Sequence, residues 1–498
     1  MDRKWISWLS GGLRALAWLL SASLLSSCVS PSLPPNKAQP VAVDWANRGH
    51  IKNAPDVDPA SWWKNFNDPV LDTLVTLTLA QNLSLAQAGY RLQASRALVR
   101  TALAQRLPQI GATASVRRQQ RLSGADSFDH DRNGLQSDGT SLPREESRVS
   151  GYYELGFDAS WEIDLFGRVA ASGDAARSAA NIALADTRIA KVSVVAEVVR
   201  NYIELRGLQR RQALFAENVA DQNRLLALTR ERLKAGIASD FDVDQRSASV
   251  VEMTAQLPLV EQAIQQATQR IAVLTGRSTV DVRLLDSASQ PSAEHLAMKL
   301  LPADLMRVRP EIQRAEHAVA QASAELGIAT ADLYPRLTLM GDLIANGNLI
   351  GTPFPRSISN ASTALSISIP LLDWGARRAI INAREAALAE AIAGYRLAVL
   401  DGVEETENAL NAIETSRRRG AENLIRLRSA QRSKANTNAL YERGVVSMAD
   451  LLEASITLRQ AQINSAETFE QQALAVVALH KAIGGASLAP TYCLCASE

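Results

Sequence analysis

Length and charge narrow the possible partners of this chain before any motif is considered. The 498 residues include 53 Lys or Arg and 52 Asp or Glu, which leaves a formal net charge of +1. A chain without a charge excess has no overall attraction to nucleic acid, and its basic residues are not gathered into one run. We therefore exclude nucleic acid as a partner. The length of 498 residues would allow several domains, but a long internal repeat indicates one architecture built twice.

The N-terminal 27 residues have the pattern of a secretory signal peptide. Two basic residues precede an apolar stretch over residues 5–25, which then meets small residues. The stretch ends in Leu-Ser-Ser-Cys, which resembles a bacterial lipoprotein signal, and its cysteine is Cys28. We expect cleavage after residue 27 and a covalent lipid, with palmitate among its acyl chains, on the sulfur of Cys28. The alternative is an ordinary signal peptide with an incidental cysteine.

The residues near Cys28 and the other cysteines bear on localisation. Val29, and not an aspartate, follows Cys28, which in lipoprotein signals directs a protein to the outer membrane. Cys493 and Cys495 are too few and too close for a disulfide framework or a four-ligand zinc site. Beyond residue 28 the sequence has no stretch of about 18 apolar residues, so it predicts that strands would make any crossing of a bilayer.

Three pairs of glycines at one offset indicate a duplicated unit. Each pair is separated by 208 residues, and Asp242 and Asp450 keep the same spacing. The pairs are Gly167 with Gly375, Gly236 with Gly444, and Gly276 with Gly484. We divide the chain into a signal peptide (1–27), an extended leader (28–60), a first repeat (61–290), a second repeat (291–487) and a C-terminal tail (488–498).

Each repeat begins with a helical pattern and continues with a β-hairpin. Apolar residues at helical spacing run over residues 71–107 and 309–334, and a proline follows each run. Apolar and polar residues then alternate, which predicts hairpins over about 109–164 and about 336–370. The predicted strands are Ile110–Val116, Leu155–Ile163, Leu337–Gly341 and Leu365–Ile369, joined within each hairpin by polar loops at about 119–150 and about 344–361.

Long helical runs follow the hairpins. The 68 residues between Gly167 and Gly236, and again between Gly375 and Gly444, contain few helix breakers. A continuous helix of that length spans about 100 Å. Return segments over 241–275 and 449–483, 35 residues each, predict antiparallel coiled coils. We expect the long runs to weaken or bend at Gly207, Gly394 and Gly402. Pro258 is expected to interrupt the first return helix only.

Membrane strands imply an assembly of several copies. Four strands cannot enclose a barrel, and an open sheet edge is not viable in lipid. Three copies supply enough strands, and their helices continue the barrel as a hollow cylinder. The predicted fold class is therefore α+β: duplicated long coiled-coil hairpins with four membrane β-strands per chain, in a homotrimer with a shared 12-stranded β-barrel and a periplasmic α-helical barrel. The alternative is a lipid-anchored coiled-coil scaffold or adhesin without a lumen.

Several motifs together resemble one family over nearly the whole mature chain. They are Cys28, the Trp62-Trp63 to Asp68-Pro69 opening, the WEIDLFGR sequence at 161–168, the IPLLDWG sequence at 369–375, and the turns at Gly236 and Gly444. In this order and spacing the motifs are similar to those of the TolC/OprM-type outer-membrane efflux factors, and more closely to the NodT-like lipoprotein branch.

The resemblance implies a trimeric channel, lipid-anchored in the cell outer membrane and extending into the periplasm. Such a channel is a passive duct for drugs or other small molecules, as in multidrug resistance. It works with a periplasmic adaptor protein and an inner-membrane pump of the resistance-nodulation-division (RND) class. A type I protein-secretion duct is the alternative within transport. The five histidines have no zinc-like spacing, and no nucleophile elbow or phosphate loop appears, so the residues predict no enzyme and no cofactor beyond the lipid.

The turns after the long helices are the candidate functional sites. By the resemblance, the adaptor-contacting tip residues are Gly236, Ser239, Gly444 and Ser447, and the aperture gate residues are Asp450 and Glu453. Each serine stands three residues before an aspartate, which is also typical of a helix capping box. Both interpretations can hold for Asp450. Gln245 occupies the first-repeat position of Glu453, so the second turn is the better candidate for the gate.

Overall fold

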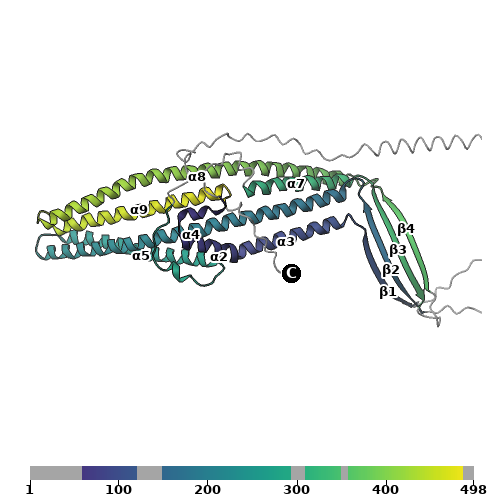
Figure 1. Cartoon of the computed structure of the whole chain (residues 1–498), viewed down its shortest axis with the longest axis horizontal. Coiled ribbons are helices and arrows are strands. Elements are labelled where there is room, and N and C mark those ends of the chain that lie inside the picture. Colours follow the sequence, from purple (N-terminus) through teal and green to yellow (C-terminus); the bar gives the residue numbers. More distant parts are fainter. Residues whose placement is uncertain (1–58, 121–148, 293–308, 349–356, 486–498) are drawn as a thin grey trace, which may run out of the picture. The chain divides into compact units, whose positions relative to one another are not determined.

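A computed structural model describes residues 59–120, 149–292, 309–348 and 357–485 (Figure 1). The helices are η2 (Pro59–Phe66), α2 (Pro69–Gln81), α3 (Leu83–Ala104), α4 (Arg168–Lys234), α5 (Asp240–Leu274), η3 (Val282–Leu284), α7 (Pro310–Ala331), α8 (Ala376–Glu442) and α9 (Met448–Ala482). The strands are β1 (Gln109–Gln120), β2 (Val149–Ile163), β3 (Arg336–Asn348) and β4 (Ser357–Ser368). The signal peptide, Cys28, most of the leader, and the tail with Cys493 and Cys495 lie outside the described residues.

The described residues fall into two compact units. One unit contains the four strands together with the neighbouring turns of α3, α4, α7 and α8. The other contains most of the helices, including all of α2, α5 and α9. Each unit draws residues from both sequence repeats.

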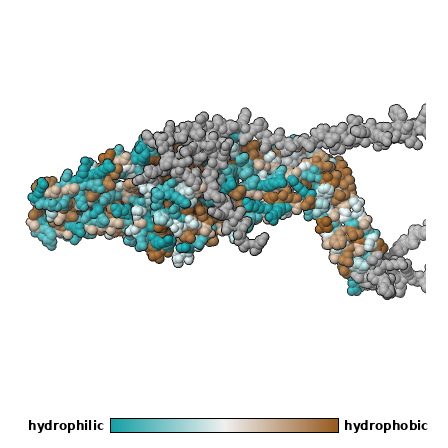
Figure 2. Space-filling model, in the orientation of Figure 1, coloured by the Kyte–Doolittle hydropathy of each residue, from teal (hydrophilic) through white to brown (hydrophobic). Residues whose placement is uncertain are grey.

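The strands form one antiparallel sheet in the order β1-β2-β3-β4. Its register places Phe157 of β2 opposite Ala112 of β1 and Leu343 of β3. Side chains alternate between faces along a strand, so the register assigns each residue to one face. One face carries mainly the apolar residues Ile110, Ala112, Ala114, Val116, Leu155, Phe157, Ala159, Trp161, Leu337, Leu339, Leu343, Ala345, Ala361, Leu365 and Ile367. Figure 2 shows hydrophobic residues gathered over these strands.

The opposite face of the sheet is mostly polar. Thr113 donates a hydrogen bond to Asp158 at 3.1 Å, and Ser362 donates one to Asp342. The predicted strands were therefore correct in type and face. The loop predicted over about 119–150 agrees with the ends of β1 and β2, but the loop predicted over about 344–361 was too long. Both β3 and β4 continue through polar residues such as Asn346, which lies opposite Ile358. A strand ladder is made by backbone groups, so it extends beyond the alternating pattern that revealed it.

The long helices and their returns confirm the predicted coiled coils. α4 and α8 have 67 residues each, and α5 and α9 have 35 each. In Figure 1, α5 runs back along α4 and α9 runs back along α8. Neither long helix is broken at its internal glycines. Pro258 lies inside α5, and the expected interruption there is wrong: one proline removes a single helical hydrogen bond, and the turns on both sides continue.

The first helical pattern is split, contrary to the single helix predicted over 71–107. α2 ends at Gln81, the backbone of the next residue, Asn82, is extended (φ −68°, ψ 122°), and α3 begins at Leu83. The side chain of Asn82 donates to the carbonyl of Leu274 at 2.9 Å and accepts from the N–H of Leu85 at 3.0 Å. Asn82 therefore ends one helix, caps the next and binds both to the end of α5.

The core of the helical unit gathers around the opening motif of the first repeat. Trp62 and Phe66 of η2 are buried with Leu71 of α2 and Val195 and Tyr202 of α4. The Tyr202 hydroxyl donates to Asp68 at 2.7 Å, and burial with this bond raises the pKa of Tyr202 to about 12. The Trp62 to Asp68 motif is thus a packing element, because its aromatic rings supply large apolar area.

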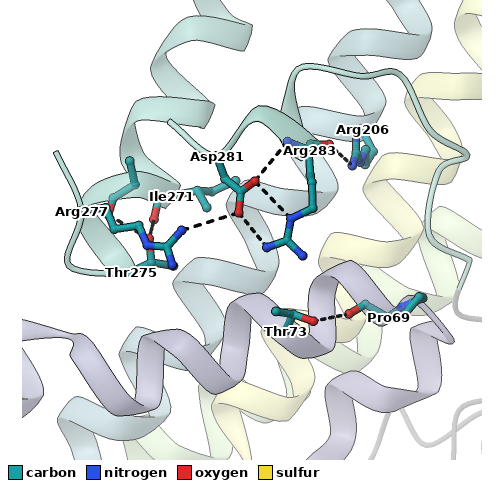
Figure 3. Close-up of polar contacts among 9 residues, drawn as sticks. Pro69, Thr73, Arg206, Ile271, Thr275, Arg277, Asp281 and Arg283 are labelled. Carbon is teal, nitrogen blue, oxygen red and sulfur yellow. Dashed lines mark hydrogen bonds and ion pairs between the residues drawn. The ribbon is translucent and has the colours of Figure 1, made fainter. Parts of the chain in front are cut away.

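The connector after α5 is attached to α4 through a buried arginine. Arg206 donates to the carbonyl of Asp286 at 2.6 Å and to Gln209 at 2.7 Å. Asp281 in turn lies between two further arginines, at 2.7 Å from Arg283 and 3.7 Å from Arg277 (Figure 3). The bond from Arg206 to Asp286, together with one from Gln209 to the carbonyl of Leu284 at 2.7 Å, holds the connector against α4, and the ion pairs of Asp281 stabilise the connector itself.

Candidate functional site: the helical tips

Each long helix ends in a glycine turn with the same backbone geometry. Gly236 and Gly444 have φ of 72° and 73°, in the left-handed region that glycine adopts without steric cost. The N–H of Ile237 donates to the carbonyl of Arg232 at 2.8 Å, and the N–H of Val445 donates to that of Leu440 at 2.9 Å. This is the Schellman termination, so both glycines have a local structural reason to stand where they do.

The helices that follow begin with the predicted capping boxes. The N–H of Asp450 donates to the Ser447 hydroxyl at 3.3 Å, and the Ser447 N–H donates to the Asp450 carboxylate at 2.8 Å. Ser239 and Asp242 make the same reciprocal pair, at 3.2 Å and 2.8 Å. Hydrogen bonds from Ser447 hold the pKa of Asp450 below its usual range. Asp450 is therefore a charged residue engaged with its own turn.

The tips expose apolar side chains beside these turns. Ile237 and Phe241 are strongly exposed at the first tip, as are Val445 and, to a lesser degree, Met448 at the second. In the single chain, most of the surface of Ile237, Phe241 and Val445 is uncovered. Exposed apolar groups rimmed by polar residues are typical of protein interaction sites.

Glu453 has a partner that the sequence pattern did not indicate. Its carboxylate accepts from the guanidinium of Arg246 at 2.5 Å, which joins α9 to α5. The pair connects the two repeats across 207 positions, and both side chains are partly exposed. Sequence spacing carried no signal for Arg246, since only the packing of the two hairpins brings it to Glu453.

The two hairpins also contact each other through α4 and α9. Arg459 of α9 lies 2.6 Å from Glu217 and 3.8 Å from Asp221, both on α4. Nearer the tips, Leu225 of α4 packs with Ala449 and Leu452 of α9. The Arg246–Glu453 pair is thus one of several links between the hairpins, and both of its side chains are partly exposed.

The described residues hold no cluster of three or more His, Cys, Asp or Glu side chains placed to bind a metal ion. Within the same residues, every helix is too short in apolar length to cross a membrane. The tips present glycine turns, exposed apolar side chains and ion pairs, among them Lys234 with Glu231 and Arg246 with Glu453.

Comparison with known proteins assigns the chain to a family. A model of the family described as outer membrane efflux protein matches residues 74–277 and 301–485. The chain belongs to this family. The efflux protein is 31% identical to nodulation protein T of Rhizobium leguminosarum bv. viciae over 477 residues, covering 94% of this chain and 92% of the relative. It is 28% identical to the pyoverdine export outer membrane protein OpmQ of Pseudomonas aeruginosa, covering 95% of this chain and 97% of the relative.

A solved structure agrees with these relatives. The outer-membrane channel OprN superposes with a TM-score of 0.74 at 28% identity, covering 90% of this chain and 97% of that one. The efflux protein is therefore an outer-membrane duct and not an enzyme, as the sequence predicted. The predicted roles of the tip and gate residues stay predictions, because family membership does not test individual positions.

Proposed function

We propose that three copies of the efflux protein form one duct that exports drugs or other small molecules together with a periplasmic adaptor and an RND-type inner-membrane pump. The main support for this assembly is the four-stranded sheet, in which β1 and β4 are the two edge strands. An unpaired strand edge is costly in lipid, and four strands are too few to close on themselves. Cyclic pairing of copies removes both edges and encloses a shared 12-stranded barrel.

Export of small molecules fits the names of the relatives. OpmQ is named for export of pyoverdine, a compound and not a protein. This favours small-molecule efflux over the alternative of type I protein secretion. A scaffold without a lumen is the second alternative, and it accounts poorly for a sheet with one apolar and one mostly polar face.

Attachment of the mature chain to the outer membrane by a lipid on Cys28 is part of the proposal. The support is the Leu-Ser-Ser-Cys sequence followed by Val29. Cys28→Ser should abolish incorporation of labelled palmitate and leave the signal peptide uncleaved at residue 27. Equal labelling of the variant and the wild type would contradict the proposed lipid.

Docking of an adaptor at the tips is the second part. The exposed side chains of Ile237 and Phe241 beside Gly236 and Ser239, and of Val445 beside Gly444 and Ser447, supply apolar area for a partner. Gly444→Glu should reduce cross-linking to the adaptor and reduce efflux, because a bulky charge then occupies a left-handed turn at the contact. Unchanged cross-linking in intact trimers would reject this contact.

The third part is a gate at the same tips. We assign separate tasks to its two acids: Asp450 keeps the turn capped, while Glu453 holds α9 to α5 through Arg246. Widening a ring of such hairpins requires neighbouring helices to separate, and an ion pair across them resists separation. Partly exposed pairs contribute only about 0–1 kcal/mol, so the closure is weak enough to be opened by a partner.

Single-channel conductance in planar bilayers tests the duct and the gate together. Wild-type protein should form pores of low conductance, and Glu453→Gln should raise the conductance several-fold because Arg246 loses its partner. The double variant Arg246→Glu/Glu453→Arg should restore low conductance, since it rebuilds the pair with reversed charges. Glu252→Gln, at an exposed acid further along α5, is the matched control and should match wild type.

Two results would count against these proposals in different ways. Equal conductance in wild type, Glu453→Gln and Asp450→Ala/Glu453→Ala would remove the gate and leave the duct. Absence of any conductance, together with absence of heat-modifiable trimers from outer-membrane fractions, would favour the scaffold.

A further inference from the structure

The seam between α4 and α9 has a polar stretch in the middle of apolar packing. On α4 the seam positions recur every three or four residues, at 214, 218, 221 and 225. Leu214 packs on α9 at one end of this stretch, and Leu225 packs on α9 at the other. Asn218 and Asp221 occupy the two positions between them, where a coiled coil ordinarily has apolar residues.

The amide of Asn218 is buried in this seam without a hydrogen bond. The residue is 0% exposed, and neither its Nδ2 nor its Oδ1 has a partner among the residues that the structure describes. Buried polar atoms in native proteins are nearly always hydrogen-bonded, either to protein or to ordered water. Because Asn218 has no exposed surface in the single chain, a neighbouring copy or another protein does not reach its amide.

Two more unpaired polar atoms belong to the same section of the seam. Gln222 stands one helical turn after Asn218 on α4, and its Oε1 is buried without a partner in the described part of the chain. Arg459 reaches across from α9, with its guanidinium 2.6 Å from Glu217 and its Nε 3.8 Å from Asp221. That Nε is buried, and 3.8 Å is too long for a hydrogen bond. A polar gap of this length is where a bridging water is expected.

The charges around Asn218 decide which kind of ligand fits. An anion would meet the carboxylates of Glu217 and Asp221, and a cation would meet the guanidinium of Arg459. The unpaired atoms are donors on Asn218 and Arg459 and acceptors on Asn218 and Gln222. Water is neutral and both donates and accepts hydrogen bonds, so it satisfies the whole set, whereas an ion satisfies only half of it.

We propose that ordered water occupies the seam between α4 and α9, bonded to the amide of Asn218, to Nε of Arg459 and to Oε1 of Gln222. This hydrated layer joins the first repeat to the second through water, while the layers on both sides join them through apolar contact. The site lies within one chain, so it depends neither on the number of copies nor on the exported compound.

A hydrated layer also lowers the cost of separating the two hairpins at this place. Parting the apolar layers exposes buried apolar surface to solvent, whereas polar groups that already bind water lose little when more water enters. Opening at the tips, which rests on the proposed gate, requires α9 to move away from its neighbours. A separation that begins at the tips therefore passes the layer of Asn218 more easily than the layers of Leu214 and Leu225.

A structure of the full-length protein in detergent at about 2 Å tests the site directly. Density for at least one water should lie within about 3.2 Å of Nδ2 or Oδ1 of Asn218, and the same water should contact Arg459 or Gln222. A protein group bonded to the amide, or an amide packed on all sides without water density, would overturn the inference.

Substitution separates a hydrated amide from one that is merely unpaired. Asn218→Leu removes the amide with little change in volume. If water bridges Asn218 to Arg459 and Gln222, the variant deprives both of a partner, and the thermal midpoint should fall by a few degrees. A midpoint that rises or stays unchanged would contradict the site, since an amide without partners is better replaced by an apolar residue. Asn223→Leu, at an exposed neighbour, is the matched control and should keep the wild-type midpoint.

A dry seam tests the effect on opening. Asn218→Leu/Asp221→Leu/Arg459→Leu continues the apolar layers through the polar stretch, so its thermal midpoint should exceed that of the wild type. In this background Glu453→Gln should raise single-channel conductance at least twofold less than it does in the wild type. An equal rise in both backgrounds would show that the hydrated layer has no part in opening. Absence of any rise in the wild-type background would instead contradict the proposed gate, and the water density would still decide the site.

Discussion

His480 shows how one side chain ties the start of the first repeat to the end of the second. It is buried on α9 and stacks on Trp62, with ring centroids 4.9 Å apart and planes at 9°. Among the described residues its Nδ1 has no hydrogen-bond partner. Burial lowers the pKa of His480 to about 4, because the charged ring would lose its hydration.

This burial predicts a stability that depends on pH. In the unfolded chain histidine takes up its proton near pH 6.5, but in the folded protein His480 does so only near pH 4. The free energy of unfolding contributed by His480 is therefore present above about pH 6.5 and is lost as the pH falls toward 4. His480→Phe should reduce the drop in thermal midpoint between pH 7.5 and pH 5.

A second histidine provides the comparison for that measurement. His317 on α7 is only partly buried, so His317→Gln should keep the wild-type drop in thermal midpoint. Identical pH profiles for wild type and His480→Phe would show that His480 is protonated equally easily in the folded and unfolded states.

At the scale of elements, glycines decide where the helices end, and their surroundings differ. Gly276, after α5, has φ of 72°, and a Cβ there would lie 2.6 Å from the carbonyl oxygen of Gln81. Gly236 has the same φ, but a Cβ would meet nothing within 4 Å. Gly394 lies inside α8 with a helical φ and open space around it. Gly394 therefore has neither a left-handed backbone nor a close neighbour, Gly236 has the left-handed backbone alone, and Gly276 has both.

Alanine substitution at the three glycines should change the free energy of unfolding in a graded way. Gly394→Ala should stabilise by up to about 1 kcal/mol, because alanine is the better helix former. Gly236→Ala should destabilise by about 1–2 kcal/mol through its left-handed backbone. Gly276→Ala should destabilise more, since its Cβ also displaces a backbone carbonyl. Thermal unfolding in detergent measures the series, and equal values for Gly236→Ala and Gly276→Ala would mean that Gln81 moves freely.

For the whole molecule, we expect the apolar face of the sheet to decide whether the protein enters a membrane. Phe157 is central on the apolar face, with Ala112 and Leu343 beside it. Phe157→Arg should reduce heat-modifiable protein in the outer membrane, because arginine facing lipid at the bilayer midplane costs about 2–4 kcal/mol. Ser115→Arg, on the polar face opposite Glu154, is the control and should assemble normally. Equal assembly of both variants would show that the apolar face does not meet lipid.

Local spacing in the sequence was sufficient to predict the long helices, the four strands and the two capping boxes. Ser447 and Asp450 are three residues apart, and each helix or strand repeats its apolar positions within a few residues. Features that depend only on residues close together in the chain can be recognised from the sequence alone. The family resemblance followed from the order of such local motifs, and it was confirmed over both repeats.

Only the tertiary structure decided the features that depend on residues far apart in the chain. Asn82 splits the first helix by binding a carbonyl 192 positions away, and Arg246 meets Glu453 across 207 positions. β3 and β4 extend through polar residues because each strand is hydrogen-bonded by its neighbour, whatever its own side chains are. A local sequence pattern indicates only how a residue interacts with its near neighbours in the chain. These outcomes depend on pairs of residues that meet only after distant parts of the chain have packed together.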